Sequence, residues 1–383
     1  MRLEALELVD FRNYQRALVE FSEGSTLVMG RNAQGKTSLL EAVFCLSGLP
    51  SPRGPDQALV RQGADRALLH GRVRRDRRAV ELDLELREGR RRALINKTPV
   101  RSARSLTDVM VAVFFGPDEL SLIKGSPEGR RRFLDDLVVE LRPGRGSLRR
   151  EWDRVLRQKN ALLRSAPRGA SGETRKTLDV WDESLIKVGA ALTGTRLECL
   201  ALLLPAARRR WEEVASEGRL NLSYQSAWLP QEVGDQAVSS GKVGESELRR
   251  HLELAISQAR PRELERGTAL TGPQRDDIYV GVSSSQGRAV MDARTFGSQG
   301  EQRTAALALK AGEFDTLTEA MREQPILLLD DVLSEVDPLR RRWLGEAVAG
   351  MDQTIVTSAE PGAAEALGAT TVLEVVDGSV RRL

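Results

Sequence analysis

The segment from Gly30 to Thr37, GRNAQGKT, constrains the fold of this chain more than any other feature. It matches the phosphate-loop pattern G-x-x-x-x-G-K-[ST], between the apolar run 26–29 and the helically spaced stretch 36–46. Such a loop wraps phosphates with its backbone N–H groups, and the helix N-terminus adds to the attraction. Lys36 is expected to bridge the β- and γ-phosphates of ATP, and Thr37 to offer its hydroxyl to Mg²⁺.

A second motif, PILLLDD at 325–331, fits a partner strand for this loop. Its apolar residues predict a buried strand that carries Asp330 to its C-terminal edge, where the carboxylate would hold Mg²⁺. Asp331 follows where a hydrolytic ATPase needs an acid to position or deprotonate the attacking water. Many strands end in two acids only because the strand end is exposed to solvent. The assignment of Asp330 and Asp331 to an ATP site therefore depends on their pairing with the phosphate loop.

The order of patterns predicts an α/β fold with an inserted helical lobe. Residues 1–30, which begin with LEALELVDF, predict two strands, and residues 68–94, which include AVELDLEL, predict further strands with a turn at Glu88-Gly89. Strand patterns return at 278–280 and in the C-terminal segment, which ends in a hairpin with a turn at Asp377-Gly378. Between these two strand-rich regions helical spacing dominates. We therefore expect an ATPase head formed by residues 1–126 and 267–383, with residues 127–266 as the inserted lobe.

The segment FGSQGEQR at 296–303 precedes an apolar helix and resembles the ABC signature L-S-G-G-Q. Ser298, Gly300 and Glu301 take the places of the serine, the second glycine and the glutamine. A second phosphate-binding helix start is useful only to a neighbour, so it predicts a head-to-tail dimer with ATP held between the two chains. Ser298 and Glu301 also fit an ordinary capping box, and both interpretations can hold.

Two further segments fit the ABC pattern. SEVD at 334–337 resembles the D-loop that crosses such a dimer interface. QTIVTS at 353–358 occupies the switch position, where transporter ATPases often carry His. No His is present there, so Thr357 or Ser358 would have to sense the γ-phosphate.

Together these blocks resemble the RecF family. The resemblance rests on LELVDFRNY, GRNAQGKTSLLEA, FGPDELSLIKGSPEGRRRFLD, TGPQRDDI, FGSQGEQRTAALALK and PILLLDDVLSEVD, which follow one another along the whole chain. It implies a head similar in fold to those of Rad50 and SMC proteins, with a short helical arm. It also implies ATP-dependent dimerisation on double-stranded DNA or single-strand/double-strand junctions, and work with RecR and RecO to load RecA at gaps.

The resemblance also implies a set of site residues. Arg12 and Asn13 would lie near the nucleotide. The contacts to nucleotide and metal would come from Gly30, Arg31, Asn32, Ala33, Gln34, Gly35, Lys36, Thr37 and Ser38. This chain departs from the family after the P-loop helix, where Ser51-Pro52-Arg53 is followed by Gly54, and at Gln274, where the family often has His. Arg275 and Asp276 are candidates for a structural ion pair.

Arginine-rich clusters are the candidate DNA contacts. The sequence pI is about 9.0 although the net charge is only +3, and nearly every cation is Arg. The first cluster comprises Arg130, Arg131, Arg132, Arg142, Arg145, Arg149, Arg150, Arg154, Arg157 and Lys159. The second comprises Arg72, Arg74, Arg75, Arg77 and Arg78, expected to face Arg90, Arg91 and Arg92 across a hairpin. Either cluster would contact phosphates without reading bases, or it would be a solvated face.

The sequence favours a slow, DNA-stimulated ATPase that acts as a switch in recombinational repair, replication restart and the SOS response. Other interpretations remain open: a transporter subunit, a Rad50-like partner of a nuclease, or an adaptor that binds ATP without turnover. The N-terminus shows no export signal and no apolar run reaches the length of a membrane span, so we expect a cytoplasmic protein with no membrane partner.

Overall fold

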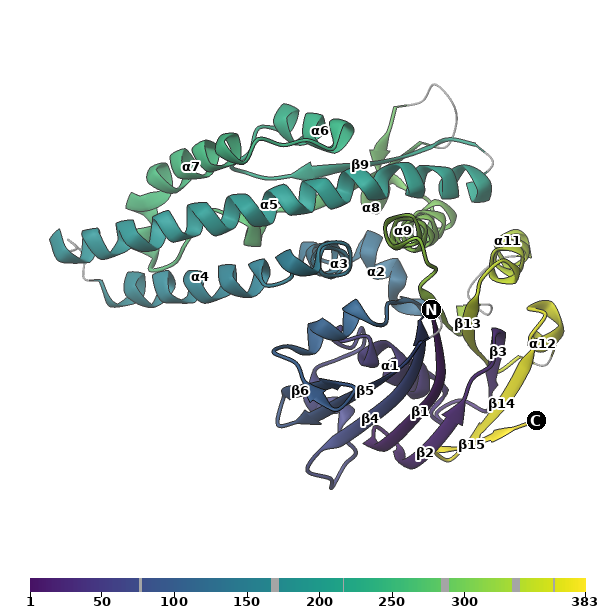
Figure 1. Ribbon diagram of the computed structural model, residues 1–383. Coiled ribbons are helices and arrows are strands. Elements are labelled where there is room, and N and C mark those ends of the chain that lie inside the picture. The colour runs from purple at the N-terminus through teal and green to yellow at the C-terminus, as the bar shows by residue number, and fades with distance from the viewer. Residues whose placement is uncertain (76–77, 167–171, 216, 284–288, 333–337, 361) are drawn as a thin grey trace. The chain divides into compact units, whose positions relative to one another are not determined.

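The computed structural model describes residues 1–75, 78–166, 172–215, 217–283, 289–332, 338–360 and 362–383 (Figure 1). The chain forms two compact units. Unit 1 comprises Met1–Glu119 and Glu313–Leu383, and unit 2 comprises Leu120–Gly312. Unit 2 thus extends beyond the expected lobe of residues 127–266.

Unit 1 contains two six-stranded sheets. The first is antiparallel, in the order β2-β1-β4-β5-β6-β7. Its strands are β1 (Arg2–Phe11), β2 (Tyr14–Glu20), β4 (Ala67–Arg75), β5 (Arg78–Arg87), β6 (Arg90–Ile95) and β7 (Thr98–Pro99). The second has the order β15-β14-β3-β13-β12-β8, with every pairing parallel except that of β15. Its strands are β3 (Gly24–Met29), β8 (Ala112–Phe115), β12 (Ile326–Asp330), β13 (Gln353–Ser358), β14 (Thr371–Val376) and β15 (Ser379–Arg382).

Helix α1 (Lys36–Leu46) packs against both of these sheets. Every residue from Leu39 to Leu46 is buried, including the apolar Leu39, Leu40 and Val43. A helix that is apolar on nearly all sides is stable only when covered all round, and here a sheet covers each side. The helix start is therefore fixed relative to the ends of the parallel strands. Unit 1 also contains α11 (Pro338–Ala349) and α12 (Ala363–Ala366).

The turns expected between the strands are confirmed. Glu88-Gly89 joins β5 to β6 and Asp377-Gly378 joins β14 to β15, and all four residues have positive φ angles between 46° and 73°. Two consecutive left-handed residues form the hairpin turn that matches strand twist. The first 30 residues form three strands where two were expected, because the chain leaves β2 after Glu20 and starts β3 at Gly24.

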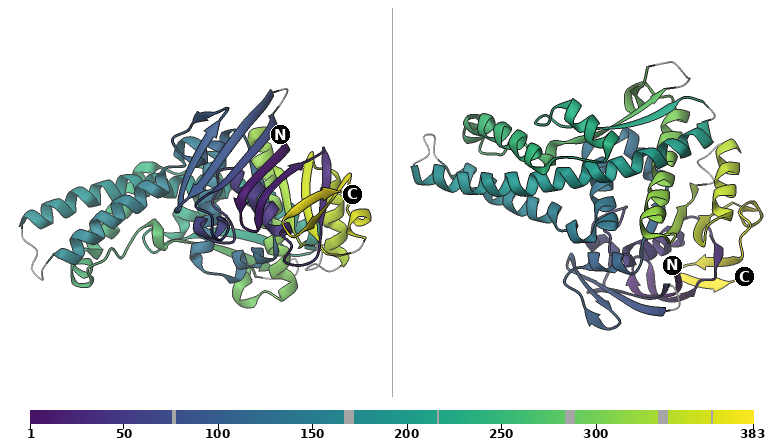
Figure 2. Two further views of the ribbon diagram at one scale, coloured as in Figure 1. Left: turned by 90° about the horizontal axis from the view of Figure 1, so that it is seen from below. Right: turned by 45° about the horizontal axis from the view of Figure 1, so that its top comes forward.

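Unit 2 is mainly helical. Its long helices α4 (Leu148–Ser165), α5 (Gly172–Ala215) and α7 (Glu245–Arg266) run side by side (Figures 1 and 2). The others are α2 (Leu120–Lys124), α3 (Pro127–Leu141), α6 (Gln231–Ser240), α8 (Ala293–Phe296) and the first part of α9 (Gln299–Met321). The strand expected at 278–280 is confirmed, whereas a strand at 219–225 was missed within the expected helical lobe. Both belong to a three-stranded sheet in the order β11-β10-β9. It comprises β9 (Arg219–Gln225), β10 (Asp277–Ser283) and β11 (Met291–Asp292).

By length and composition alone, α5 could cross a membrane. However, 72% of its most apolar window is buried inside the structure. That burial is typical of the core helix of a soluble protein.

The core of unit 2 contains a charged network around Arg196, whose side chain is fully buried on α5. Its guanidinium makes two hydrogen bonds to Asp135 of α3, at 2.7 and 2.9 Å, and donates to the Pro273 carbonyl. Buried Asp276 accepts hydrogen bonds from Tyr224 and Trp228, and burial raises its pKa to about 6. The expected Arg275–Asp276 ion pair is therefore wrong: the Arg275 side chain donates instead to the Ala269 carbonyl.

Replacing Arg196 by Met should destabilise the fold by about 3–5 kcal/mol, because Asp135 would lose its bidentate partner inside the core. Urea unfolding of Arg196→Met should show this, with the exposed Arg157→Met on α4 as control. Equal stability of the Arg196 variant and the wild type would contradict the role given to this network.

Candidate functional site

The phosphate loop lies between the end of β3 and the start of α1, as the motif requires. Gly30 and Gly35 have φ angles of 157° and 116°. A Cβ added to Gly35 would lie 2.6 Å from the amide nitrogen of the Asn13 side chain. The loop conformation and its close neighbours thus both require glycine at position 35.

Residues distant in sequence hold this loop in place. The side chain of Asn13 donates to the Gln34 carbonyl at 2.9 Å, and the Tyr14 hydroxyl donates to the Gly35 carbonyl at 2.8 Å. Burial raises the pKa of that phenol. On the other side, the Asp377 amide donates to the Gln34 side chain at 2.6 Å. The turn β1–β2 and the C-terminal hairpin therefore clamp the loop from both sides.

Lys36 points back across the loop. Its ammonium donates to the carbonyls of Gly30 at 2.7 Å and Arg31 at 3.0 Å. Burial lowers the pKa of Lys36, while the carboxylates of Asp331 and Asp330 act in the opposite direction. A desolvated ammonium that contacts neutral carbonyl oxygens can exchange them for anionic oxygens within its reach.

Asp330 ends the buried strand β12 and is itself only 3% exposed. Its Oδ1 accepts hydrogen bonds from the hydroxyls of Thr37, at 2.8 Å, and Thr357, at 2.7 Å. Arg53 approaches the other carboxylate oxygen at 3.4 Å. Asp330 and Thr357 are register partners on neighbouring parallel strands, which brings the two side chains together. The predicted pairing of the loop threonine with the strand acid is thus present.

Asp331 lies just beyond the strand in a left-handed conformation with φ of 49°. Its amide donates to the Thr357 hydroxyl at 3.0 Å and approaches the Thr357 carbonyl at 3.2 Å. The two candidates for the switch residue, Thr357 and Ser358, have different surroundings. Thr357 lines the cleft beside Asp331, whereas the Ser358 hydroxyl caps the backbone of Glu360.

These groups line a cleft of about 590 Å³ in unit 1. The expected residues along it are Arg12, Asn13, Asn32, Ala33, Gly35, Lys36, Thr37, Ser38 and Asp331. Sequence reasoning gave no role to four others: Arg53, Ala58, Val60 and Gln62. They come from the loop after α1 and from the region of the 3-10 helix η1 (Asp56–Leu59), which carries no recognised motif.

In unit 2, the signature segment forms a complete capping box at the start of α9. The Ser298 hydroxyl accepts from the Glu301 amide at 3.2 Å, and the Glu301 carboxylate accepts from the Ser298 amide at 2.8 Å. Ser298 is exposed, and Phe296 just before it is 65% exposed. The segment therefore both caps α9 and presents an exposed surface, as the two interpretations together require. The D-loop candidate, 334–337, lies outside the described residues.

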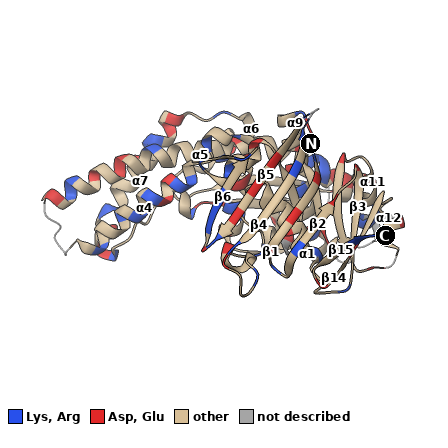
Figure 3. Ribbon diagram, turned by 60° about the horizontal axis from the view of Figure 1, so that its bottom comes forward, with Lys and Arg blue, Asp and Glu red and all other residues tan. Residues whose placement is uncertain are grey.

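Two members of the first basic cluster, Arg130 and Lys159, are internal. Arg130 is buried and makes a bidentate pair with Asp277 at 2.7 and 2.8 Å. Lys159 is fully buried between Asp182 and Glu263. These side chains cannot reach DNA phosphates without breaking the core. In Figure 3 acidic residues, in red, alternate with basic residues, in blue, along the ribbons of α4 and α7. The exposed members of the cluster are Arg132, Arg142, Arg145, Arg150, Arg154 and Arg157, the last three on α4.

The second cluster does not have the expected facing arrangement. In the strand register, Arg75 of β4 lies opposite Arg78 at one end of β5, and Arg90 of β6 lies opposite Arg87 at the other end. The two groups of arginines therefore lie at opposite ends of β5. Arg91 is bound by both oxygens of Asp56, at 2.6 and 2.7 Å. Arg77 lies outside the described residues.

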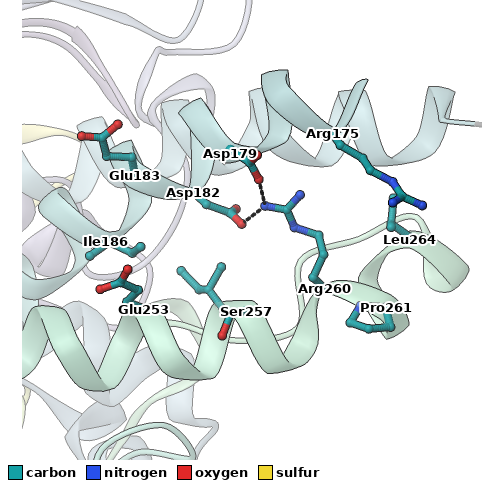
Figure 4. A pocket seen from close by; sticks show the side chains of 11 residues that line it. Arg175, Asp179, Asp182, Glu183, Ile186, Glu253, Ser257, Arg260, Pro261 and Leu264 are labelled. Carbon is teal, nitrogen blue, oxygen red and sulfur yellow. Dashed lines mark hydrogen bonds and ion pairs between the residues drawn. The ribbon is translucent and has the colours of Figure 1, made fainter. Parts of the chain in front are cut away.

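Unit 2 has a cleft of its own, of about 880 Å³, between α5 and α7 (Figure 4). Within it, Arg260 of α7 binds both Asp179 and Asp182 of α5. Asp182 also pairs with buried Lys159. These ion pairs link α4, α5 and α7.

The model of the RecF/RecN/SMC N-terminal domain family matches residues 2–379. The DNA replication and repair protein RecF of Cutibacterium acnes is 40% identical over 374 residues, 94% of this chain and 92% of that protein. RecF of Streptomyces avermitilis is 37% identical over the full length of both chains.

Among solved structures, "recombination mediator protein RecF-ATP in RecFOR pathway" aligns with a TM-score of 0.88 and 28% identity, over 100% of this chain and 97% of that one. An Smc head domain from Pyrococcus furiosus shares the fold, with a TM-score of 0.53 and 15% identity over 100% of this chain and 95% of that one. The architecture is that of an ABC-type ATPase head with inserted helices. The chain belongs to the RecF family of DNA replication and repair proteins.

Proposed function

We propose that this chain is an ATP-dependent DNA-binding protein of recombinational repair, whose cleft in unit 1 binds ATP and hydrolyses it slowly. The observation that carries the proposal is the convergence of Lys36, Thr37, Asp330 and Thr357 around the phosphate loop. The solved relative described with ATP supports the choice of nucleotide.

The phosphates would lie against the backbone N–H groups of the loop. Lys36 would exchange the carbonyls of Gly30 and Arg31 for β- and γ-phosphate oxygens. That exchange is favourable because a cation gains more from anionic than from neutral acceptors. The remaining contacts would come from Asn32, Ala33, Gln34, Gly35 and Ser38, with Arg12 and Asn13 along the wall.

The donor set at the loop suits Mg²⁺. The Thr37 hydroxyl and the Asp330 carboxylate, 2.8 Å apart, are hard oxygen ligands. No cluster of three metal-binding side chains occurs in the described part of the chain. This fits an ion that takes its other ligands from phosphates and water. When bound, Mg²⁺ would neutralise charge that develops on the phosphates.

Asp331 would orient the attacking water and accept its proton, which yields ADP and phosphate. Thr357 holds the Asp331 amide and also binds Asp330, so it sets the relative position of the two acids. Through these two contacts the Thr357 hydroxyl would link the residue that binds Mg²⁺, Asp330, to the residue that orients the attacking water, Asp331.

The dimer would form when Ser298, Gly300 and Glu301 of one chain meet the ATP of another. ATP would close this head-to-tail dimer on double-stranded DNA, including single-strand/double-strand junctions, and hydrolysis stimulated by DNA would release it. The RecFOR pathway named for the solved relative supports RecR and RecO as partners. Loading of RecA at gaps or stalled forks, replication restart and the SOS response would follow in the cytoplasm.

Asp331→Asn should bind ATP normally but block its hydrolysis, because an amide cannot accept the water's proton. Asn tolerates the left-handed backbone at this position, so the fold should persist. Lys36→Met is the contrasting variant and should lose nucleotide binding. Equilibrium binding and single-turnover hydrolysis measure both effects; normal turnover by Asp331→Asn would show that another group activates the water.

Ser298→Arg should bind ATP through its own loop yet fail to dimerise, because the long side chain would fill the place of the partner's γ-phosphate. Ser298→Ala is the matched control: it loses the cap, at about 1 kcal/mol, without adding bulk. Size-exclusion chromatography with a slowly hydrolysed ATP analogue separates the two cases. Normal dimerisation of a folded Ser298→Arg protein would remove the signature from the interface.

Duplex DNA binding by the ATP-bound protein should weaken steeply with salt and depend little on sequence, because contacts to phosphates release counterions. Replacing the exposed Arg154 and Arg157 by Glu should lower affinity, and each lost contact should reduce the salt slope by about 0.9. Arg90→Glu with Arg92→Glu tests the second cluster in the same titration. Salt-insensitive or sequence-specific binding would contradict the backbone mode.

A further inference from the structure

One carboxylate at the back of the cleft is buried without a role in the proposed chemistry. Glu41 lies on α1, one turn after Thr37, with 2% of its surface exposed. It accepts two hydrogen bonds from Arg12, at 2.8 and 2.7 Å, and a third from the Ser51 hydroxyl. Three donors from two distant segments thus converge on one acid.

Arg12 extends the contact to the cleft wall. Its backbone is left-handed, with φ of 54°, and its amide donates to the Leu59 carbonyl at 2.7 Å. The guanidinium also donates to the Ala58 carbonyl at 2.8 Å. Glu41 therefore fixes, through Arg12, both the Arg12–Asn13 turn and the end of η1, where Ala58 lines the cleft. The hydrogen bond to Glu41 raises the pKa of Arg12.

Ser51 extends the contact to the metal side of the cleft. It is fully buried, and its hydroxyl accepts a hydrogen bond from the Arg53 amide at 3.0 Å. The Arg53 guanidinium in turn lies 3.4 Å from the Asp330 carboxylate. The link from α1 through Ser51 thus sets the backbone from which Arg53 reaches Asp330.

We propose that Glu41 is a positioning residue of the nucleotide cleft, which fixes the wall through Arg12 and the hydrolytic end through Ser51 and Arg53. The inference deepens the proposed function and rests on it. The carboxylate suits both branches because two oxygens without protons can accept several donors at once. A glutamine has one acceptor oxygen, and its NH₂ group would face the donors of Arg12.

The two branches can be tested separately. Arg12→Gln should weaken binding of a slowly hydrolysed ATP analogue about tenfold, as expected for the loss of hydrogen bonds to a charged group, with the single-turnover rate retained. Ser51→Ala should lower the single-turnover rate at saturating ATP while affinity stays near that of the wild type. Glu41→Gln should show both defects.

A coupling measurement sharpens the test. Adding Ser51→Ala to Glu41→Gln should lower the rate no further, because both changes break the same link. Asp10→Asn is the matched control. It removes the neighbouring ion pair between Arg61 and Asp10, at 2.7 Å. Like Arg12, this pair joins the end of β1 to the chain around η1, but it does not involve α1. This control should retain both affinity and rate.

Thermal unfolding of each variant distinguishes positioning from mere stability. Affinity and rate unchanged in folded Glu41→Gln protein, or defects fully explained by a smaller folded fraction, would overturn the proposal. If Glu41→Gln does not fold, the Arg12 and Ser51 variants still decide, because the proposal requires their defects to differ. Wild-type protein that fails to bind ATP, or binds it no better than Lys36→Met, would instead refute the proposed function itself.

Discussion

The cleft depends on a carboxylate placed almost out of reach of water at the end of a buried strand. Burial of an acid is costly unless hydrogen bonds compensate for lost hydration. Asp330 meets this requirement through two threonine hydroxyls, one from the loop helix and one from the neighbouring strand. The compensation works only if β12, β13 and α1 keep their register. The geometry of the site and the packing of the parallel sheet are thus a single requirement.

The strands and helix that carry the site could be predicted from the sequence because each has a strong local signal. The loop motif, the apolar strand before Asp330 and the two hairpin turns lie where their patterns indicate. Strand β9 was missed although Leu220, Leu222 and Tyr224 alternate inward along it. The strand was missed because its seven residues follow directly on the long helix α5, and because its partner β10 is more than fifty residues away in sequence.

Pairing between charged residues could not be predicted, because it depends on which distant segments meet. Arg130 stands in a run of three arginines that resembles a DNA-binding surface, yet it is matched by Asp277. Lys159 and Arg196 are likewise enclosed by acids. The buried cations of unit 2 therefore organise its interior. Arg53 shows the converse error, since it was assigned no role from the sequence and still lines the cleft.

The clamp on Gln34 has a consequence for the order of synthesis. Strand β3, which delivers the loop, lies between β14 and β13, and the Asp377 amide binds Gln34 across 343 positions. A ribosome releases the loop sequence long before the residues that brace it. A nascent chain therefore carries the complete motif for most of its translation without the surroundings that give it shape. Nucleotide can meet a finished site only after the final hairpin has emerged, so a truncated product would expose the motif without its support.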